Sequence, residues 1–114
     1  MTYQWTKQSM DYRQYTCPIH KTTLLVGDRW TLFLIREFIY ESKEQGFNQL
    51  LRALKPISSR TLSKKLKQLV EHGILQKKVG KENSMQVKYH ITKKGKALKK
   101  ALDSMGVWYK QYNQ

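Results

Sequence analysis

The sequence predicts a mainly helical α+β fold in a single small domain. Apolar residues recur at helical spacing over residues 17–72, alternate with polar ones over residues 74–91, and return to helical spacing up to residue 112. The chain has 114 residues, 39% of them hydrophobic, which is enough apolar material for one core. We therefore expect one domain over residues 1–114, made of an N-terminal arm (1–16), a core (17–92) and a C-terminal helix (93–114).

The first two helices are predicted from the residues at their ends. Pro18 suits the first position of a helix that begins after Cys17 and is closed by Gly27. Asp28 is a good N-cap for a second helix over residues 29–40. Apolar residues occupy nearly every side of this second helix, so we expect it to be the central, buried one.

A short helix and a longer amphipathic helix follow. A polar turn is expected over residues 41–46, and Asn48 can cap the short helix. Ser58 caps the longer helix, which runs to Glu71 and is ended by Gly73. The apolar residues that would pack this helix on the core are Leu62, Leu66, Leu69 and Val70.

The spacing of apolar residues then changes to that of strands. Residues 74–79 and 85–91 are predicted as two strands, joined by a polar hairpin tip at residues 80–84. Thr92 caps a last helix that continues to about Tyr112. Two helices joined by a tight turn, the second of them basic and followed by a hairpin, form a winged helix-turn-helix.

The positive charge of the chain is concentrated in its second half. Lys and Arg total 22 against 8 acidic residues, for a formal net charge of +14. Residues 53–114 hold fifteen of the basic residues and three of the acidic ones. A one-sided basic surface is typical of proteins that bind a polyanion, with nucleic acid the first candidate and an anionic membrane surface the second.

Side chains at the start of the basic helix are placed to contact double-stranded DNA. Its apolar side is anchored on the core, so the opposite side is free to enter the major groove. There Ser59 and Arg60 would reach base edges, and Lys64 and Lys67 would meet phosphates. The residues predicted to bind DNA are Ser58, Ser59, Arg60, Thr61, Ser63, Lys64 and Lys67 on the helix and Lys81 and Asn83 on the hairpin tip.

These motifs resemble those of the HxlR-type winged helix-turn-helix regulators. The resemblance implies a homodimeric DNA-binding transcription regulator of bacteria or archaea, dimerised through its terminal helices. Two features depart from the family pattern: the wing tip lacks the usual prolines and arginine, and Lys88 stands where an acidic residue is usual. The matching stretches are Cys17–Ile19, Gly27–Leu32, Phe47–Leu50, Ile57–Ser63, Leu66–Leu69, Gly73–Leu75 and Val87–Thr92, with Gly95.

The last helix carries an apolar seam with the spacing of a coiled-coil contact. In one interpretation this seam only covers the core of its own subunit. In the other, which we favour, it joins two subunits, because a two-fold DNA site requires a dimer. The predicted interface residues are Leu98, Leu102, Met105, Trp108, Tyr109 and Tyr112.

Cys17 is the one cysteine of the chain, so an intramolecular disulfide is excluded. It lies at a helix N-terminus near Arg13, His20 and Lys21, and backbone amides and cations at such a place favour the reactive thiolate. Some members of the family that the chain resembles sense oxidants or electrophiles with a cysteine here. The other interpretation is an inert buried cysteine.

An enzyme is not expected. His20, His72 and His90 are far apart and lack metal-ligand spacing, no glycine-rich phosphate loop is present, and Glu37 is interpreted as a helix surface charge. No catalytic residue, metal site or cofactor is therefore predicted. No apolar run could cross a membrane or act as a signal peptide, so we expect a cytoplasmic protein.

Two other functions remain as alternatives to a sequence-specific regulator with a palindromic operator. An architectural protein could coat DNA through charge alone, without hydrogen-bonding groups at the start of one helix. An RNA-binding winged helix would favour exposed aromatic residues, and the basic helix has none. Its cations, Arg60, Lys64, Lys65 and Lys67, could also be a solvated face, as we interpret Lys93, Lys94, Lys96, Lys99 and Lys100. The sequence does not specify the effector.

Overall fold

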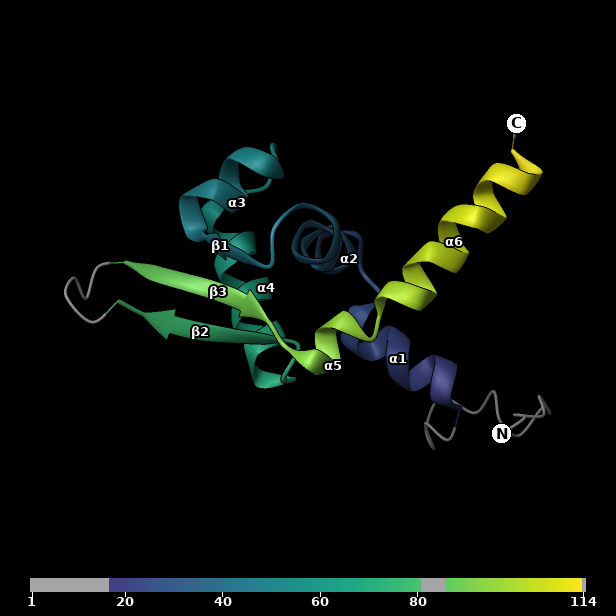
Figure 1. The fold of residues 1–114 in the computed structure, drawn as a ribbon, viewed down its shortest axis with the longest axis horizontal. Helices are drawn as coiled ribbons and strands as arrows, with labels where there is room; N and C mark the ends of the chain where they lie inside the picture. The colour runs from purple at the N-terminus through teal and green to yellow at the C-terminus, as the bar shows by residue number, and fades with distance from the viewer. Residues whose placement is uncertain (1–16, 81–85, 114) are drawn as a thin grey trace.

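The computed structural model describes residues 17–80 and 86–113 and has the predicted mainly helical α+β architecture (Figure 1). Six α-helices and one π-helical segment, η2, are combined with a small sheet in these residues. The elements are α1 (Pro18–Val26), α2 (Arg29–Arg36), η2 (Glu37–Glu41), β1 (Glu44–Gly46), α3 (Phe47–Ala53), α4 (Ser59–Glu71), β2 (Leu75–Val79), β3 (Val87–Ile91), α5 (Lys93–Lys96) and α6 (Lys99–Tyr112).

The sheet has three antiparallel strands in the order β1-β3-β2. β2 and β3 form the predicted hairpin, with Leu75 opposite Ile91 and Val79 opposite Val87. The expected polar turn over residues 41–46 is wrong in part, because Glu44–Gly46 pairs with the other edge of β3 as strand β1. A strand of three residues is too short to show an alternating pattern in the sequence.

The core lies where α2, α3 and α4 meet the sheet. Its fully buried side chains are mostly leucines from the three helices, with Phe38 from η2 and Ile91 from β3. The prediction that the second helix is central is confirmed, but its burial on nearly every side is not. Phe33 and Tyr40 are each 42% exposed, whereas Glu37, expected as a surface charge, is only 9% exposed.

The N-caps of three helices follow the predicted pattern. The side chains of Cys17, Asp28 and Ser58 accept hydrogen bonds from backbone N–H groups in the first turns of α1, α2 and α4. The short helix α3 differs, because Gly46 and not Asn48 is its N-cap. The Gly46 N–H donates to the side chain of Gln49 over 2.9 Å, so strand β1 leads directly into the helix.

The last segment is two helices and not the single one expected. Thr92 caps the four-residue helix α5 and accepts from the Gly95 N–H over 3.1 Å, but the helix stops after one turn. Gly95 packs directly against the backbone of Ile74, which holds α5 on the core. The chain turns at residues 97–98, and α6 then extends away from the body of the molecule (Figure 1).

The contact at Gly95 leaves no room for a side chain. A Cβ atom there would lie 2.5 Å from the Ile74 carbonyl oxygen and 2.7 Å from Cγ1 of Ile91. We predict that Gly95→Ala lowers the free energy of unfolding in urea by about 1–3 kcal/mol, the usual cost of overpacking. The matched control is Gly106→Ala on α6, where nothing lies within 4 Å. Alanine favours a helix over glycine by about 0.5–1 kcal/mol, so this control should not destabilise. Equal effects of the two changes would contradict the packing argument.

Candidate nucleic-acid interface

Helix α4 is held at its N-terminus by a compact hydroxyl cap. The Thr61 N–H donates to Oγ of Ser58 over 3.1 Å, and the Ser58 hydroxyl lies 2.9 Å from Oγ1 of Thr61. The buried side chain of Ile57 precedes this cap and anchors the turn after α3. The hydroxyl groups of Ser58 and Thr61, both predicted to bind DNA, are therefore engaged with each other in the cap.

The rotation of α4 is fixed by its buried side. The side chains of Leu62, Leu66 and Leu69 are completely or almost completely buried, and Val70 is half-buried beside them. α4 packs through this side on α2, α3 and β2. Five of the predicted DNA-binding residues within α4 are exposed as a result: Ser59, Arg60, Ser63, Lys64 and Lys67.

Lys65 does not belong to the solvated face that the sequence suggested. Its side chain is mostly buried, and its Nζ lies 3.1 Å from Oδ2 of Asp28, the N-cap of α2. Asp28 also accepts from the Thr31 N–H over 3.0 Å and from the Thr31 hydroxyl over 2.6 Å. Burial raises the pKa of the Asp28 carboxyl, but the bonds from Thr31 and Lys65 outweigh it and hold that pKa below its ordinary value. The ion pair thus ties α4 to α2.

The hairpin beside α4 presents lysines at exposed positions. Lys78 on β2 and Lys88 on β3 face each other across the strand pair, and both are exposed. Like charges directly opposite each other repel, so this pair adds no stability to the hairpin itself. Lys81 and Asn83, predicted to bind DNA from the tip, lie outside the described residues. Lys78 was not among the predicted residues, although its pairing with Lys88 follows from the hairpin register.

The lysines after the hairpin differ from one another in their roles. The Nζ of Lys94 donates to the carbonyl oxygen of His72 over 2.7 Å and so caps the C-terminal end of α4. Lys99 pairs with Asp103 at 2.8 Å. Lys93, Lys96 and Lys100 are exposed, as a solvated face would be. Two of the five lysines therefore have structural contacts that the sequence pattern did not indicate.

Cys17 occupies the predicted place at the start of α1. Its side chain is fully buried, and its Sγ accepts from the His20 N–H over 3.4 Å. The exposed thiol that would make a fast-reacting cysteine is absent from this arrangement. The predicted neighbour Arg13 lies in the arm, outside the described residues.

The apolar seam of α6 divides into a packed and an exposed part. Leu98 and Leu102 pack on the core of their own subunit. Beyond them Trp108 is 61% and Tyr112 66% exposed, and Met105 and Tyr109 are exposed as well. Sequence reasoning missed the exposed apolar residues of α1 at the base of α6, Ile19, Leu24 and Leu25.

A groove of about 550 Å³ runs between α2 and α6. Its lining includes the apolar side chains of Leu32, Phe33 and Met105 and the cationic side chains of Arg36 and Lys110. Within residues 17–80 and 86–113, His, Cys, Asp and Glu side chains form no cluster able to hold a metal ion. No helix of this described part is long and apolar enough to cross a membrane.

Comparisons with known proteins agree on the class of this fold. A family model, HxlR-like helix-turn-helix, matches residues 25–114. An uncharacterized HTH-type transcriptional regulator of Synechocystis sp. is 33% identical over 91 residues, which cover 80% of this chain and 66% of that protein. YvaP of Bacillus subtilis, also an uncharacterized HTH-type transcriptional regulator, is 31% identical over 93 residues, covering 81% of this chain and 84% of YvaP.

Solved structures show the same arrangement. The reduced form of the transcriptional regulator YodB from B. subtilis superimposes with a TM-score of 0.71 at 27% identity, covering 87% of this chain and 96% of YodB. The oxidized form of the redox regulator HypR gives a TM-score of 0.73 over 86% of this chain and 99% of HypR, and its 24% identity supports a likeness of fold alone.

The ion pair between Asp28 and Lys65 predicts an acid-dependent loss of stability. Asparagine is also a good N-cap, so Asp28→Asn keeps the cap and removes the charge. We expect this change to lower the free energy of unfolding at pH 7 by up to about 1 kcal/mol, the range of a partly exposed ion pair. A carboxyl whose pKa is lowered by folding stabilises the fold above its ordinary pKa, 3.8, and loses this effect as the pH falls through the lowered value.

Urea unfolding of both proteins between pH 7 and pH 2.5 tests this expectation, and the difference between them should narrow below pH 3.8. Glu71→Gln, at an exposed position on α4, is the control for removing one acidic charge. A difference between wild type and Asp28→Asn that stays constant with pH would contradict the role of the ion pair.

Proposed function

The chain belongs to the HxlR-like helix-turn-helix family of transcriptional regulators, and from this premise we propose that it binds a specific operator in double-stranded DNA as a homodimer. The observation that carries the proposal is the composition of the exposed side of α4. Ser59, Arg60 and Ser63 lie in its first two turns, with hydrogen-bonding groups free to meet base edges. Lys64 and Lys67 follow on the same exposed side, where phosphates of the groove wall would lie.

Ser58 and Thr61 contribute to this proposal through the backbone. Their hydroxyl groups form the cap of α4, and the cap fixes where the first turn of the helix begins. Helix N-termini attract phosphate because their backbone N–H groups are directed outward. Lys78 and Lys88 on the hairpin extend the cationic surface toward the adjacent DNA backbone. Lys81 and Asn83, which lie outside the described residues, remain predicted DNA contacts.

The competing function, charge-driven coating of DNA, does not need hydrogen-bonding side chains at defined positions on one helix. Coating requires only an exposed cationic surface, because phosphate contacts carry no sequence information. Helix α4 is instead held by its N-terminal cap, by its ion pair to α2 and by the contact between Lys94 and His72. Contacts that fix the rotation of one helix favour readout of a DNA sequence over coating. The described part of α4 also lacks the exposed aromatic side chain that an RNA-binding surface would favour.

The exposed apolar residues of α6 and α1 support the homodimer. Met105, Trp108, Tyr109 and Tyr112 form a surface on α6 that its own core does not cover. Contiguous exposed apolar surfaces of this kind mark interaction sites. Two copies related by a two-fold axis would place their α4 helices about 34–36 Å apart and so match a palindromic operator.

Arg60 gives the most direct test of sequence readout. Arg60→Ala should weaken binding to the operator by about 1–3 kcal/mol, because a side chain in contact with a base edge discriminates by that amount. The matched control is Lys100→Ala, an exposed cation away from α4. This control should weaken binding to operator and to random DNA by the same small amount. The slope of log affinity against log salt concentration should change by no more than about one unit. Equal losses of Arg60→Ala on operator and random DNA would exclude Arg60 from base readout.

We propose Cys17 as the residue through which thiol-reactive compounds act on the protein. The YodB structures include a quinone-bound form and a diamide-treated form. Because Cys17 is the chain's one cysteine, its products are an adduct, a mixed disulfide or a Cys17–Cys17 bond between subunits. Its side chain is fully buried, so reaction requires the first turn of α1 to open, and an added group cannot return to the same space. The adduct would therefore displace α1 at the base of α6.

The expected outcome is loss of operator binding after modification. N-ethylmaleimide at pH 7 should modify wild type more slowly than a free thiol and weaken its operator affinity at least about tenfold, equal to 1.4 kcal/mol. Cys17→Ser, which keeps a good N-cap, should bind the operator and not respond. Complete modification with unchanged affinity would make Cys17 a structural residue only.

A further inference from the structure

Helix α2 continues into the π-helical segment η2, which is held in place by hydrogen bonds from strand β1 of the sheet. In η2 the Ser42 N–H donates to the Glu37 carbonyl oxygen over 3.2 Å, five residues back, which widens the last turn. π-helical turns are rare and are frequently found at functional sites. The wide turn leaves two carbonyl groups, those of Glu37 and Ser42, directed toward strand β1.

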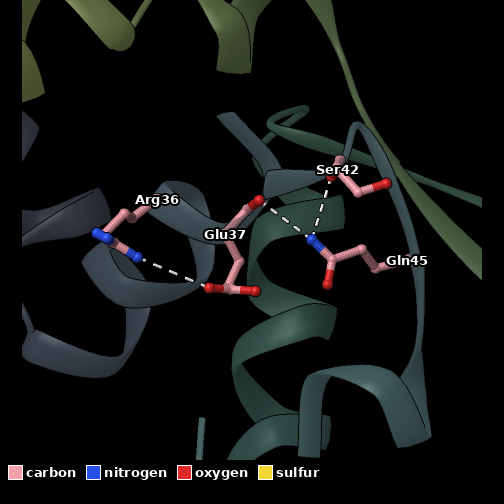
Figure 2. Close-up of polar contacts among 4 residues, drawn as sticks. All are labelled: Arg36, Glu37, Ser42 and Gln45. Atoms are coloured by element: carbon pink, nitrogen blue, oxygen red, sulfur yellow. Dashed lines mark hydrogen bonds and ion pairs between the residues drawn. The ribbon is translucent and has the colours of Figure 1, made fainter. Parts of the chain in front are cut away.

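The side-chain amide of Gln45 binds both of these carbonyl groups (Figure 2). Its Nε2 donates to the oxygens of Glu37 and Ser42, each over 3.1 Å, and the residue is only 4% exposed. A buried amide with both protons bonded is costly to displace. Gln45 also pairs with Tyr89 of β3, so η2 is joined through one side chain to the wing strands.

Tyr40 continues this connection to α6. The Tyr40 hydroxyl donates to Oδ1 of Asp103, and Lys99 binds Oδ2 of the same carboxylate over 2.8 Å. The Lys99 ammonium also lies over the Tyr40 ring, 5.6 Å from its centroid. The bonds from Lys99 and Tyr40 lower the pKa of the Asp103 carboxyl, so the carboxylate that both bind is the charged form.

Lys99 and Asp103 lie in the first two turns of α6, the helix that extends away from the body of the molecule (Figure 1). Leu98 and Leu102 pack on the core, and the rest of the helix is exposed. A 14-residue helix is about 21 Å long. A tilt of about 10° at its base would therefore move its far end by roughly 4 Å. Among the described residues, the contacts that set the direction of α6 lie near its start.

We propose that Gln45, Tyr40 and Asp103 are positioning residues that fix the direction of α6 relative to α4, and with it the separation of the two α4 helices in the dimer. The inference rests on the proposed homodimer for its second part only. None of the three side chains lies on the exposed side of α4, so they act through helix direction and not through contact with DNA. The chain of contacts runs from β3 through Gln45 to η2, and from Tyr40 to α6.

Distances between spin labels test the proposal without DNA. The labels are attached in the Cys17→Ser protein at Glu71→Cys on α4 and Lys110→Cys on α6, both exposed positions. Doubly labelled chain is mixed with an excess of unlabelled chain, so that the distance within one subunit is measured. We expect a narrow distribution that Tyr40→Phe shifts or broadens on the order of 3 Å, as a tilt of about 10° produces.

A double-mutant cycle separates this role from a general loss of stability. Asp103→Ala should change the distribution as Tyr40→Phe does, and the double variant should add nothing further. Lys100→Ala, the neighbour of Lys99, is the control and should leave the distribution unchanged. Gln45→Met, which keeps the length of the side chain but not its amide, should give the same broadening. If Gln45→Met unfolds, Tyr40→Phe and Asp103→Ala still test the proposal. A lower melting temperature with an unchanged distribution in Tyr40→Phe and Asp103→Ala would overturn the proposal.

A second measurement, with one label per chain at Glu71→Cys, reports the separation of the two α4 helices. A broader distribution of this separation in Tyr40→Phe supports the claim that these residues fix the separation of the two α4 helices. An unchanged distribution overturns that claim. If no distance between subunits is detected, the homodimer itself is contradicted and the second part falls with it. The distance within one subunit then still decides whether these residues position α6.

Discussion

The packing of Leu62, Leu66 and Leu69 into the core sets the rotation of α4, and the rest of the structure depends on that rotation. The three side chains are almost completely buried against α2, α3 and β2. Each contributes roughly 1.5–3 kcal/mol to stability by leaving water, so any other rotation of α4 would expose them at a large cost. The same packing leaves Ser59, Arg60, Ser63, Lys64 and Lys67 outward. Core stability and presentation of the cationic side are therefore one constraint.

Polar contacts at both ends of α4 refine this placement. Ser58 and Thr61 cap its start, Lys94 caps its end, and the pair of Lys65 and Asp28 ties its middle to α2. Each of these three contacts uses a residue type, Ser, Thr or Lys, that a DNA-binding protein also uses to contact phosphate. In a chain of net charge +14, individual lysines thus serve the fold as well as the partner. The net charge indicates a polyanionic partner. Only the contacts in the structure distinguish lysines that stabilise the fold from exposed lysines that can meet this partner.

The elements that the sequence predicted well are those with strong end signals and long periods. α1, α2 and α4 begin at Cys17, Asp28 and Ser58 because each side chain satisfies a free backbone N–H, and this chemistry is local. α4 and the hairpin were also predictable from their apolar patterns, which run over five or more residues. The HxlR resemblance, carried by these same stretches, is confirmed by the family match over residues 25–114.

The features that the sequence did not predict depend on contacts between distant residues. β1 exists because three residues pair with β3, more than forty positions later, and no local pattern marks so short a strand. Helix α5 ends after one turn and is held on the core by the contact of Gly95 with Ile74, which lies far back in the sequence. Glu37 is almost fully buried at the start of η2, and Lys65 contacts Asp28 only once α2 and α4 are packed together. For the candidate site, the exposed side of α4 followed from the sequence, whereas the anchoring of α6 through Tyr40 did not.

The central claim is that two copies of α4, held at one rotation and one separation, recognise a two-fold DNA sequence. Selection of bound sequences from a random pool of double-stranded DNA tests it most directly, because it assumes no operator. The account predicts enrichment of an inverted repeat whose half-site centres lie about 10–11 base pairs apart, or a multiple of this spacing. Binding of the pool without enrichment of any inverted repeat would contradict the account and support a protein that coats DNA through its charge.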